Sequence, residues 1–247
     1  MEHPKIGITP DIEWRTAENP PRPYYELDHT LVSAVKAAGG CPILLPHEPE
    51  LVKSYLNGLN GIVVSGDNYR FTSPGLFAGL EAVQEEDVPA FKLNRTRFEI
   101  ALINEALQQD IPILAICAGF QILNVVMGGT VVVDINSDPA VFLQHRQTEA
   151  ATVATHPIAI QSDTLLRRII GQSSTEINSI HSQSIRLAPD AVASALSPDG
   201  LIEAIEVPTK RFCIGTQWHP EFLAGDGDGK IIEGLIEASR SPSSHRK

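Results

Sequence analysis

The feature that most constrains the fold is a run of six residues without a charged or polar side chain, 111–116, which ends at Cys117. An apolar run with no polar alternation predicts a strand that is buried on both faces. Residues 121–127, just after the cysteine, carry apolar side chains at helical spacing. A buried strand that passes directly into a helix predicts a parallel sheet covered by helices.

The rest of the first half repeats this alternation. Short apolar runs predict strands at 5–9, 41–45 and 61–64, and amphipathic stretches predict helices at 29–38, 49–56 and 97–109. The second half is richer in β-branched residues and predicts strands at 130–134, 152–160, 191–196, 201–207 and 211–217, before a last helix at 230–238. A turn sequence at 198–200 predicts that some of these strands form antiparallel hairpins.

Two segments depart from the alternation. Residues 20–25 are rich in proline and tyrosine, and residues 70–92 mix glycine, proline and acidic side chains. We interpret both as flaps over a site. No linker or repeat divides the chain, so we expect a single domain over residues 1–240, and we expect residues 241–247, the end of a frayed segment that starts at Ser239, to form a tail.

Composition excludes several classes of function. The net charge of −11 argues against binding to a phosphate backbone. The three cysteines match neither a disulfide framework nor a zinc pattern, which indicates a reducing compartment. No segment has the length of a bilayer span and the first residues do not resemble a secretory signal, so we expect a cytoplasmic protein without nucleic-acid or membrane partners.

Cys117 lies where a nucleophile is found in many hydrolases. The sequence Ala115-Ile-Cys117-Ala-Gly119 resembles a nucleophile elbow, in which small neighbours let the backbone pass close to the reactive side chain. The following helix N-terminus favours a thiolate. Taken alone, inert packing is the better interpretation, because free cysteine is among the most buried residue types.

A cysteine nucleophile needs a base and an acceptor that orients the base. His219 and Glu221 follow the apolar strand at 213–216, and Pro220 restricts the link between them. We expect His219 to leave the same edge of the sheet as the cysteine. Among the other histidines, we interpret His47 as a solvated loop residue, while His29, His145 and His156 have no acid close by in a comparable frame. The remaining ones are His3 and His245, near the termini and expected to be solvated, and His181.

These motifs resemble a known family. The segments around Cys117-Ala-Gly-Phe-Gln121 and Trp218-His219-Pro-Glu221 are similar to class I glutamine amidotransferase domains, in the γ-glutamyl-γ-aminobutyrate hydrolase (peptidase C26) branch. The resemblance extends to Arg95 and Glu99, and to the segments at 6–10, 61–68, 128–130, 178–183 and 200–204. It implies a flavodoxin-like three-layer α/β sandwich, with helices on both faces of a mostly parallel sheet and a small antiparallel addition.

The resemblance also implies a role for each matching residue. Cys117 is the expected nucleophile, His219 the general base and then acid, and Glu221 the residue that orients His219. The backbone N–H groups of Gly66 and Ala118 match the oxyanion hole of the family. Three further residues match its substrate-binding wall: Gln121, Ser179 and His181. A hydrogen-bonded turn is an equal interpretation for Ser179 and His181.

The expected reaction is hydrolysis of a γ-glutamyl amide through a thioester, without a metal or an organic cofactor, on a small-molecule substrate. Departures from the family pattern at Ser65, Thr96, Ala118 and Ser182 concern the pocket rather than the triad, so the leaving amine stays open. Two alternatives remain: a glutaminase subunit that supplies ammonia to a synthetase, and a non-catalytic binding protein on the same scaffold. A homodimer is an open alternative to a monomer.

Overall fold

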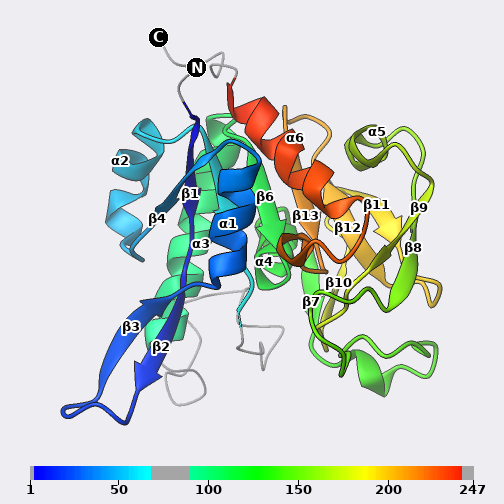
Figure 1. The fold of residues 1–247 in the computed structure, drawn as a ribbon, viewed down its shortest axis with the longest axis horizontal. Coiled ribbons are helices and arrows are strands. Elements are labelled where there is room, and N and C mark those ends of the chain that lie inside the picture. The colour runs from blue at the N-terminus through cyan, green and yellow to red at the C-terminus, as the bar shows by residue number, and fades with distance from the viewer. Residues whose placement is uncertain (1–2, 68–89, 241–247) are drawn as a thin grey trace.

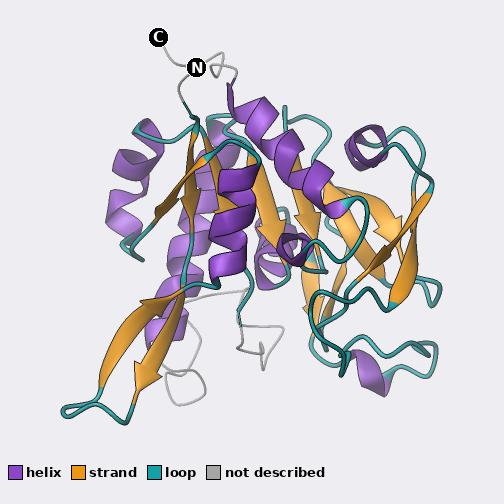
Figure 2. Cartoon of the chain, in the orientation of Figure 1, coloured by secondary structure: helices purple, strands orange, loops and turns teal. Residues whose placement is uncertain are grey.

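A nine-stranded mixed sheet runs through the part of the chain that the computed structural model describes, residues 3–67 and 90–240 (Figures 1 and 2). In sheet order its strands are β4 (Cys41–Leu44), β1 (Lys5–Ile8), β5 (Gly61–Val64), β6 (Ile113–Ile116), β13 (Cys213–Thr216), β12 (Ile202–Glu206), β11 (Val192–Leu196), β8 (His156–Ile160) and β9 (Ser174–Ile177). The first five are parallel. The last four join by antiparallel pairing.

Helices cover both faces of this sheet (Figure 1). Three of them, α1 (His29–Ala37), α5 (Leu165–Ile170) and α6 (Asp228–Arg240), pack in one apolar cluster with Leu114 of β6. The other three, α2 (Val52–Asn57), α3 (Ala90–Gln108) and α4 (Ala118–Val126), pack in a second cluster with Ile113 of the same strand. Adjacent residues of β6 therefore face opposite layers, as expected for a strand buried on both sides. This arrangement confirms the predicted α/β class, a flavodoxin-like sandwich with a mostly parallel centre.

Smaller elements extend the sandwich. Two antiparallel two-stranded sheets pair β7 (Thr130–Val132) with β10 (Ser184–Arg186), and β2 (Asp11–Arg15) with β3 (Arg22–Glu26). The second pair forms an arm that extends away from the main sheet at the lower left of Figure 1. Short 3₁₀ turns occur at Pro49–Leu51, Ile135–Ser137 and Pro220–Phe222. The predicted turn at 198–200 does join two antiparallel strands, β11 and β12, and Gly200 has a φ of 84° there.

Several expectations differ from the structure. Residues 20–25, interpreted as a flap over a site, lie in the β2–β3 arm, where β3 begins at Arg22. Of the segment 70–92, residues 70–89 lie outside the described residues, and 90–92 begin α3, seven positions before the predicted start at 97. Buried charged residues in this first part of α3 hide its helical pattern. Ser239 is buried within α6 and bonds to Leu235, whereas residues 241–247 lie outside the described chain.

The sequence analysis missed α5, β9 and β10, which are all short. Among the described residues, no helix has both the length and the apolar character needed to cross a membrane.

Candidate active site

Cys117 lies in a strained turn between β6 and α4. Its φ is 51°, a value that side chains other than glycine rarely adopt. The neighbouring strand β13 fixes the Cys117 backbone, because its N–H donates to Thr216 O at 2.8 Å. Gly119 is required by the same turn, since a Cβ there would lie 2.3 Å from Val64 O of β5. The close approach of β5 thus explains why the elbow-like motif has a glycine at this position.

His219 leaves β13, the strand that is hydrogen-bonded to β6. Its Nδ1 lies 2.8 Å from Glu221 Oε1. Asn178 fixes the backbone of His219 from both sides, accepting from its N–H at 2.9 Å and donating to its carbonyl at 3.0 Å. Pro220 begins a 3₁₀ turn that carries Glu221 back toward the ring. The structure therefore brings together Cys117, His219 and Glu221 as the sequence analysis expected.

The charges around His219 favour its protonated form. Burial alone would lower the pKa of His219, but the Glu221 carboxylate and the Cys117 sulfur, which is also its hydrogen-bond partner, raise that pKa well above its ordinary value. An imidazolium beside the sulfur stabilises a thiolate by direct ion pairing. The Cys117 sulfur and the Glu221 carboxylate thus both stabilise a positive charge on His219.

Gly66 follows β5, on the other side of Cys117. A Cβ on Gly66 would lie 2.9 Å from His219 Cε1 and 3.6 Å from Cys117 Cβ, so only glycine leaves the space above the sulfur open. Its carbonyl accepts a hydrogen bond from Arg95 Nη2 at 2.8 Å, which fixes the orientation of the loop. Ala118 is the first residue of α4, and the first N–H groups of a helix have no intrahelical acceptor.

Arg95 is almost fully buried and connects three segments. It pairs with Glu99 of its own helix at 3.0 Å and with Asp11 of β2 at 2.7 Å, in addition to its contact with the Gly66 loop. Lys92 pairs with Asp11 and, at 2.7 Å, with Asp67. Two cations and three carboxylates thus share one largely buried network beneath that loop.

A cavity of about 640 Å³ opens above the sulfur. Its wall comes from the β2–β3 arm, the loops after β5 and β13, the start of α4 and the segment 180–183. The residues that line it are Asp11, Glu13, Glu26, Leu27, Asp28, Leu31, Ser65, Gly66, Asp67, Cys117, Ala118, Gln121, Arg146, Ile180, His181, Ser182, Gln183, His219, Glu221 and Phe222. The cavity has room for a small molecule and places it against the cysteine.

Gln217, to which the sequence analysis gave no role, lies between Gln121 and the Cys117 sulfur. Gln121 Nε2 donates to Gln217 Oε1 at 3.1 Å, and Gln217 Nε2 lies 3.6 Å from Cys117 Sγ. Both amides are buried. The position of Gln217, two residues before His219 in the same motif, was the signal that could have identified it.

The other two residues expected in the substrate-binding wall, Ser179 and His181, lie in different places. His181 lines the cavity, whereas Ser179 is not among the described residues that line it. The Ser179 hydroxyl instead donates to His145 O at 3.0 Å behind the wall. Direct contact of either residue with a substrate stays a prediction.

The surroundings of two histidines differ from the sequence interpretation. His47 is buried rather than solvated, and its Nε2 lies 3.0 Å from Pro10 O. His145 does have acidic neighbours, because Asp199 and Glu203 approach its two ring nitrogens at 3.0 and 3.3 Å. Both acids are far from it in the sequence, so local spacing gave no sign of them.

Comparison with known proteins identifies the family. Residues 4–221 match the family described as Peptidase C26. The chain belongs to this family. Membership makes it a hydrolase that acts on amide bonds.

Three proteins are similar to this chain over most of its length. A putative glutamine amidotransferase-like protein of Rickettsia prowazekii is 31% identical over 97% of this chain and 99% of its own length. The gamma-glutamyl-gamma-aminobutyrate hydrolase PuuD of Escherichia coli K12 is 34% identical over 86% and 85%. A putative glutamine amidotransferase of Mycobacterium tuberculosis is 33% identical over 96% and 75%.

Solved structures show the same fold at low identity. A putative GMP synthase component of Thermoplasma acidophilum superposes with a TM-score of 0.64 at 17% identity, covering 97% of this chain and 96% of its own. The glutaminase domain of Trypanosoma brucei CTPS, with bound acivicin, gives 0.61 at 13% identity over 96% and 94%. The C26 chain therefore shares the sandwich of class I glutamine amidotransferases.

Proposed function

We propose that this C26 hydrolase is a cysteine enzyme that cleaves the γ-glutamyl amide bond of a small γ-glutamyl compound, such as γ-glutamyl-γ-aminobutyrate, and releases glutamate and an amine. The observation that carries the proposal is the meeting of Cys117, His219 and Gly66 at the carboxyl ends of three adjacent parallel strands, β6, β13 and β5. The carboxyl edge of a parallel sheet is where such folds bind ligands.

In the proposed acylation step, the Cys117 thiolate attacks the γ-carbonyl carbon. The oxyanion accepts hydrogen bonds from the Gly66 and Ala118 backbone N–H groups, each of which contributes about 3 to 4 kcal/mol in comparable sites. The His219 imidazolium gives its proton to the departing amine as the C–N bond breaks. A γ-glutamyl thioester on Cys117 and a free amine result.

In the proposed deacylation step, neutral His219 removes a proton from water, which attacks the thioester carbonyl. The C–S bond breaks, the Cys117 thiolate leaves, and glutamate is released. Glu221 keeps the proton of His219 on Nδ1 and directs Nε2 at the reacting groups. The buried Gln121–Gln217 pair supports a polar pocket for the glutamyl group beside the sulfur.

The hairpin arm is the proposed site for the leaving amine. Asp11, Glu13 and Glu26 line the cavity from one face of the β2–β3 ladder. The charge of Asp11 is matched by Lys92 and Arg95. Glu13 and Glu26 are exposed, and Glu26 has one long ion pair, at 3.9 Å, with Arg15 of the same arm. We infer that amines with a second positive charge, such as diamines, bind there better than amines that carry a carboxylate.

A substrate panel tests the proposal. Purified protein is incubated with γ-glutamyl amides of neutral, cationic and carboxylate-bearing amines and with free glutamine, and glutamate release is measured. We expect release from at least one γ-glutamyl amide in the absence of any partner protein, and a loss on the order of 10³-fold or more in Cys117→Ser. Turnover of free glutamine alone would favour the glutaminase alternative. No turnover of any compound would favour a binding protein.

A further inference from the structure

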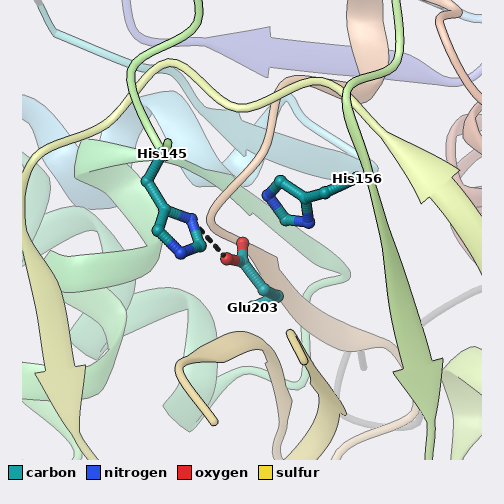
Figure 3. A group of neighbouring side chains, drawn as sticks. All are labelled: His145, His156 and Glu203. Atoms are coloured by element: carbon teal, nitrogen blue, oxygen red, sulfur yellow. Dashed lines mark ion pairs between the residues drawn. The ribbon is translucent and has the colours of Figure 1, made fainter. Parts of the chain in front are cut away.

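A second polar cluster lies behind the wall of the cavity, away from the sulfur. His145, His156 and Glu203 are buried, and one potential ligand atom from each lies within 4.8 Å of the others. Figure 3 shows the two imidazole rings on either side of the Glu203 carboxylate. His181 approaches the same carboxylate, with its Nε2 3.5 Å from Glu203 Oε1. The mechanism proposed above uses none of these contacts.

Hydrogen bonds fix which ring nitrogen of each histidine faces the cluster. His156 Nδ1 lies 3.1 Å from Pro157 O, and His181 Nδ1 lies 2.9 Å from Gln183 O. A carbonyl oxygen only accepts, so each Nδ1 carries a proton and each Nε2 is the free nitrogen. His145 is held in the opposite sense, with Nε2 3.0 Å from Asp199 Oδ2 and Nδ1 facing Glu203.

Some of the atoms that face one another lack hydrogen-bond partners, whereas His145 Nδ1 lies 3.3 Å from Ser179 Oγ. His156 Nε2 and Glu203 Oε2 are buried and have no hydrogen bond among the described residues. The distance from His145 Nδ1 to Glu203 Oε1 is 3.3 Å. Two ligands that bind one tetrahedral zinc ion at about 2.0 to 2.1 Å stand about 3.4 Å apart. The 3.3 Å spacing therefore fits a zinc ion bound by both atoms.

We propose that His145 Nδ1, His156 Nε2 and the Glu203 carboxylate bind a zinc ion, while His181 Nε2 contacts the same carboxylate. Imidazole and carboxylate form a common donor set for zinc, whereas calcium and magnesium prefer oxygen ligands alone. The Asp199 contact to His145 is the carboxylate–histidine–metal arrangement that orients ligands in zinc proteins. Asp199 itself accepts from Ser197 Oγ and from the Leu143 backbone N–H.

The proposed ion has a structural role. Its ligands come from β8, β12 and the loop 143–147. The loop 178–183 is joined to the first loop by an isolated bridge between Arg146 and Ile180, and its His181 contacts Glu203. Because His181 lines the cavity, the ion fixes the wall that faces the substrate. The three ligands lie behind the wall of the cavity and away from the sulfur, so the ion takes no part in the thiol chemistry.

Metal content tests the proposal. The full chain is expressed in zinc-supplemented medium, purified without chelators and measured by inductively coupled plasma mass spectrometry. We expect close to one zinc ion per chain, loss of stoichiometric zinc in His156→Asn and Glu203→Gln, and an affinity about 10- to 100-fold weaker in Asp199→Asn. His47→Asn is the matched control, because His47 is also buried and bonded to one carbonyl but lies outside the cluster. It keeps its zinc.

A second measurement needs no ligand variant and so does not depend on whether the variants fold. The zinc K-edge X-ray absorption spectrum of the wild-type chain is expected to contain nitrogen and oxygen neighbours without sulfur, and Cys117→Ser is expected to retain the zinc. Sulfur in the first coordination shell, or loss of zinc in Cys117→Ser, would place the ion at the active-site thiolate and overturn the proposal. Absence of binding in a zinc titration of the chelator-treated chain would also overturn it, because protons on the histidines would then hold the cluster.

Discussion

At the residue scale, the strained turn at Cys117 depends on the glycine two positions later. Gly119→Ala places a Cβ against Val64 O, and we expect it to destabilise the fold by about 1 to 3 kcal/mol. Gly229→Ala is the matched control in α6, where the added Cβ makes only an ordinary contact at 3.8 Å with Leu223. It should be neutral or stabilising by up to about 1 kcal/mol. Urea unfolding measures both, and equal effects of the two variants would contradict the steric account.

Also at the residue scale, the pH dependence of the reaction reports the charge of His219. The imidazolium is needed to protonate the leaving amine, so the alkaline limb of kcat/KM follows the pKa of His219, which is raised above its ordinary value. Glu221→Gln removes an anion that raises this pKa. We therefore expect the alkaline limb to move to lower pH, with kcat reduced by up to about 10⁴-fold. A limb that stays in place would show that Glu221 does not set the charge of the base.

At the element scale, the β2–β3 arm should determine which amine is accepted. Replacing both Glu13 and Glu26 by glutamine removes two negative charges from the cavity wall. We expect kcat/KM for a γ-glutamyl diamine to fall about two- to five-fold, with little change for a neutral amine of similar size. Glu18→Gln, in the turn of the same arm, is the control. The same loss for both substrates would indicate a packing effect instead of charge recognition.

At the scale of the whole molecule, Arg95 joins α3 to the β2–β3 arm and to the loop that carries Gly66. Arg95→Met leaves buried carboxylates, among them Glu99, without their main partner. We expect a loss of about 3 to 5 kcal/mol in the free energy of unfolding. Glu237→Gln, which breaks an exposed pair with Arg240, should change it by less than about 1 kcal/mol. Similar losses of unfolding free energy in the two variants, measured by chemical denaturation, would mean that the burial of Arg95 is not important for stability.

The sequence predicted what local patterns encode. Cys117 and His219 each follow a short apolar strand, and parallel strands bring their carboxyl ends together, so these two residues could be placed at one edge from spacing. Gly66 was identified only through the resemblance to the family. The start of α3 could not be predicted, because the buried Lys92, Arg95 and Glu99 make that face polar. Nor could the cluster around His145, since His145 and Asp199 lie 54 positions apart and meet only in the folded chain. A single domain over residues 1–240, a cytoplasmic location and a homodimer stay predictions.

The central claim is that Cys117 forms a γ-glutamyl thioester. The most direct measurement is acid quenching of the enzyme during turnover of a γ-glutamyl amide, followed by peptide mass spectrometry of the trapped adduct. The account predicts a γ-glutamyl group on the peptide that contains Cys117, sensitive to hydroxylamine and absent in Cys117→Ser. A γ-glutamyl group on Cys41 or Cys213, or hydrolysis that continues in Cys117→Ser at the original rate, would contradict it.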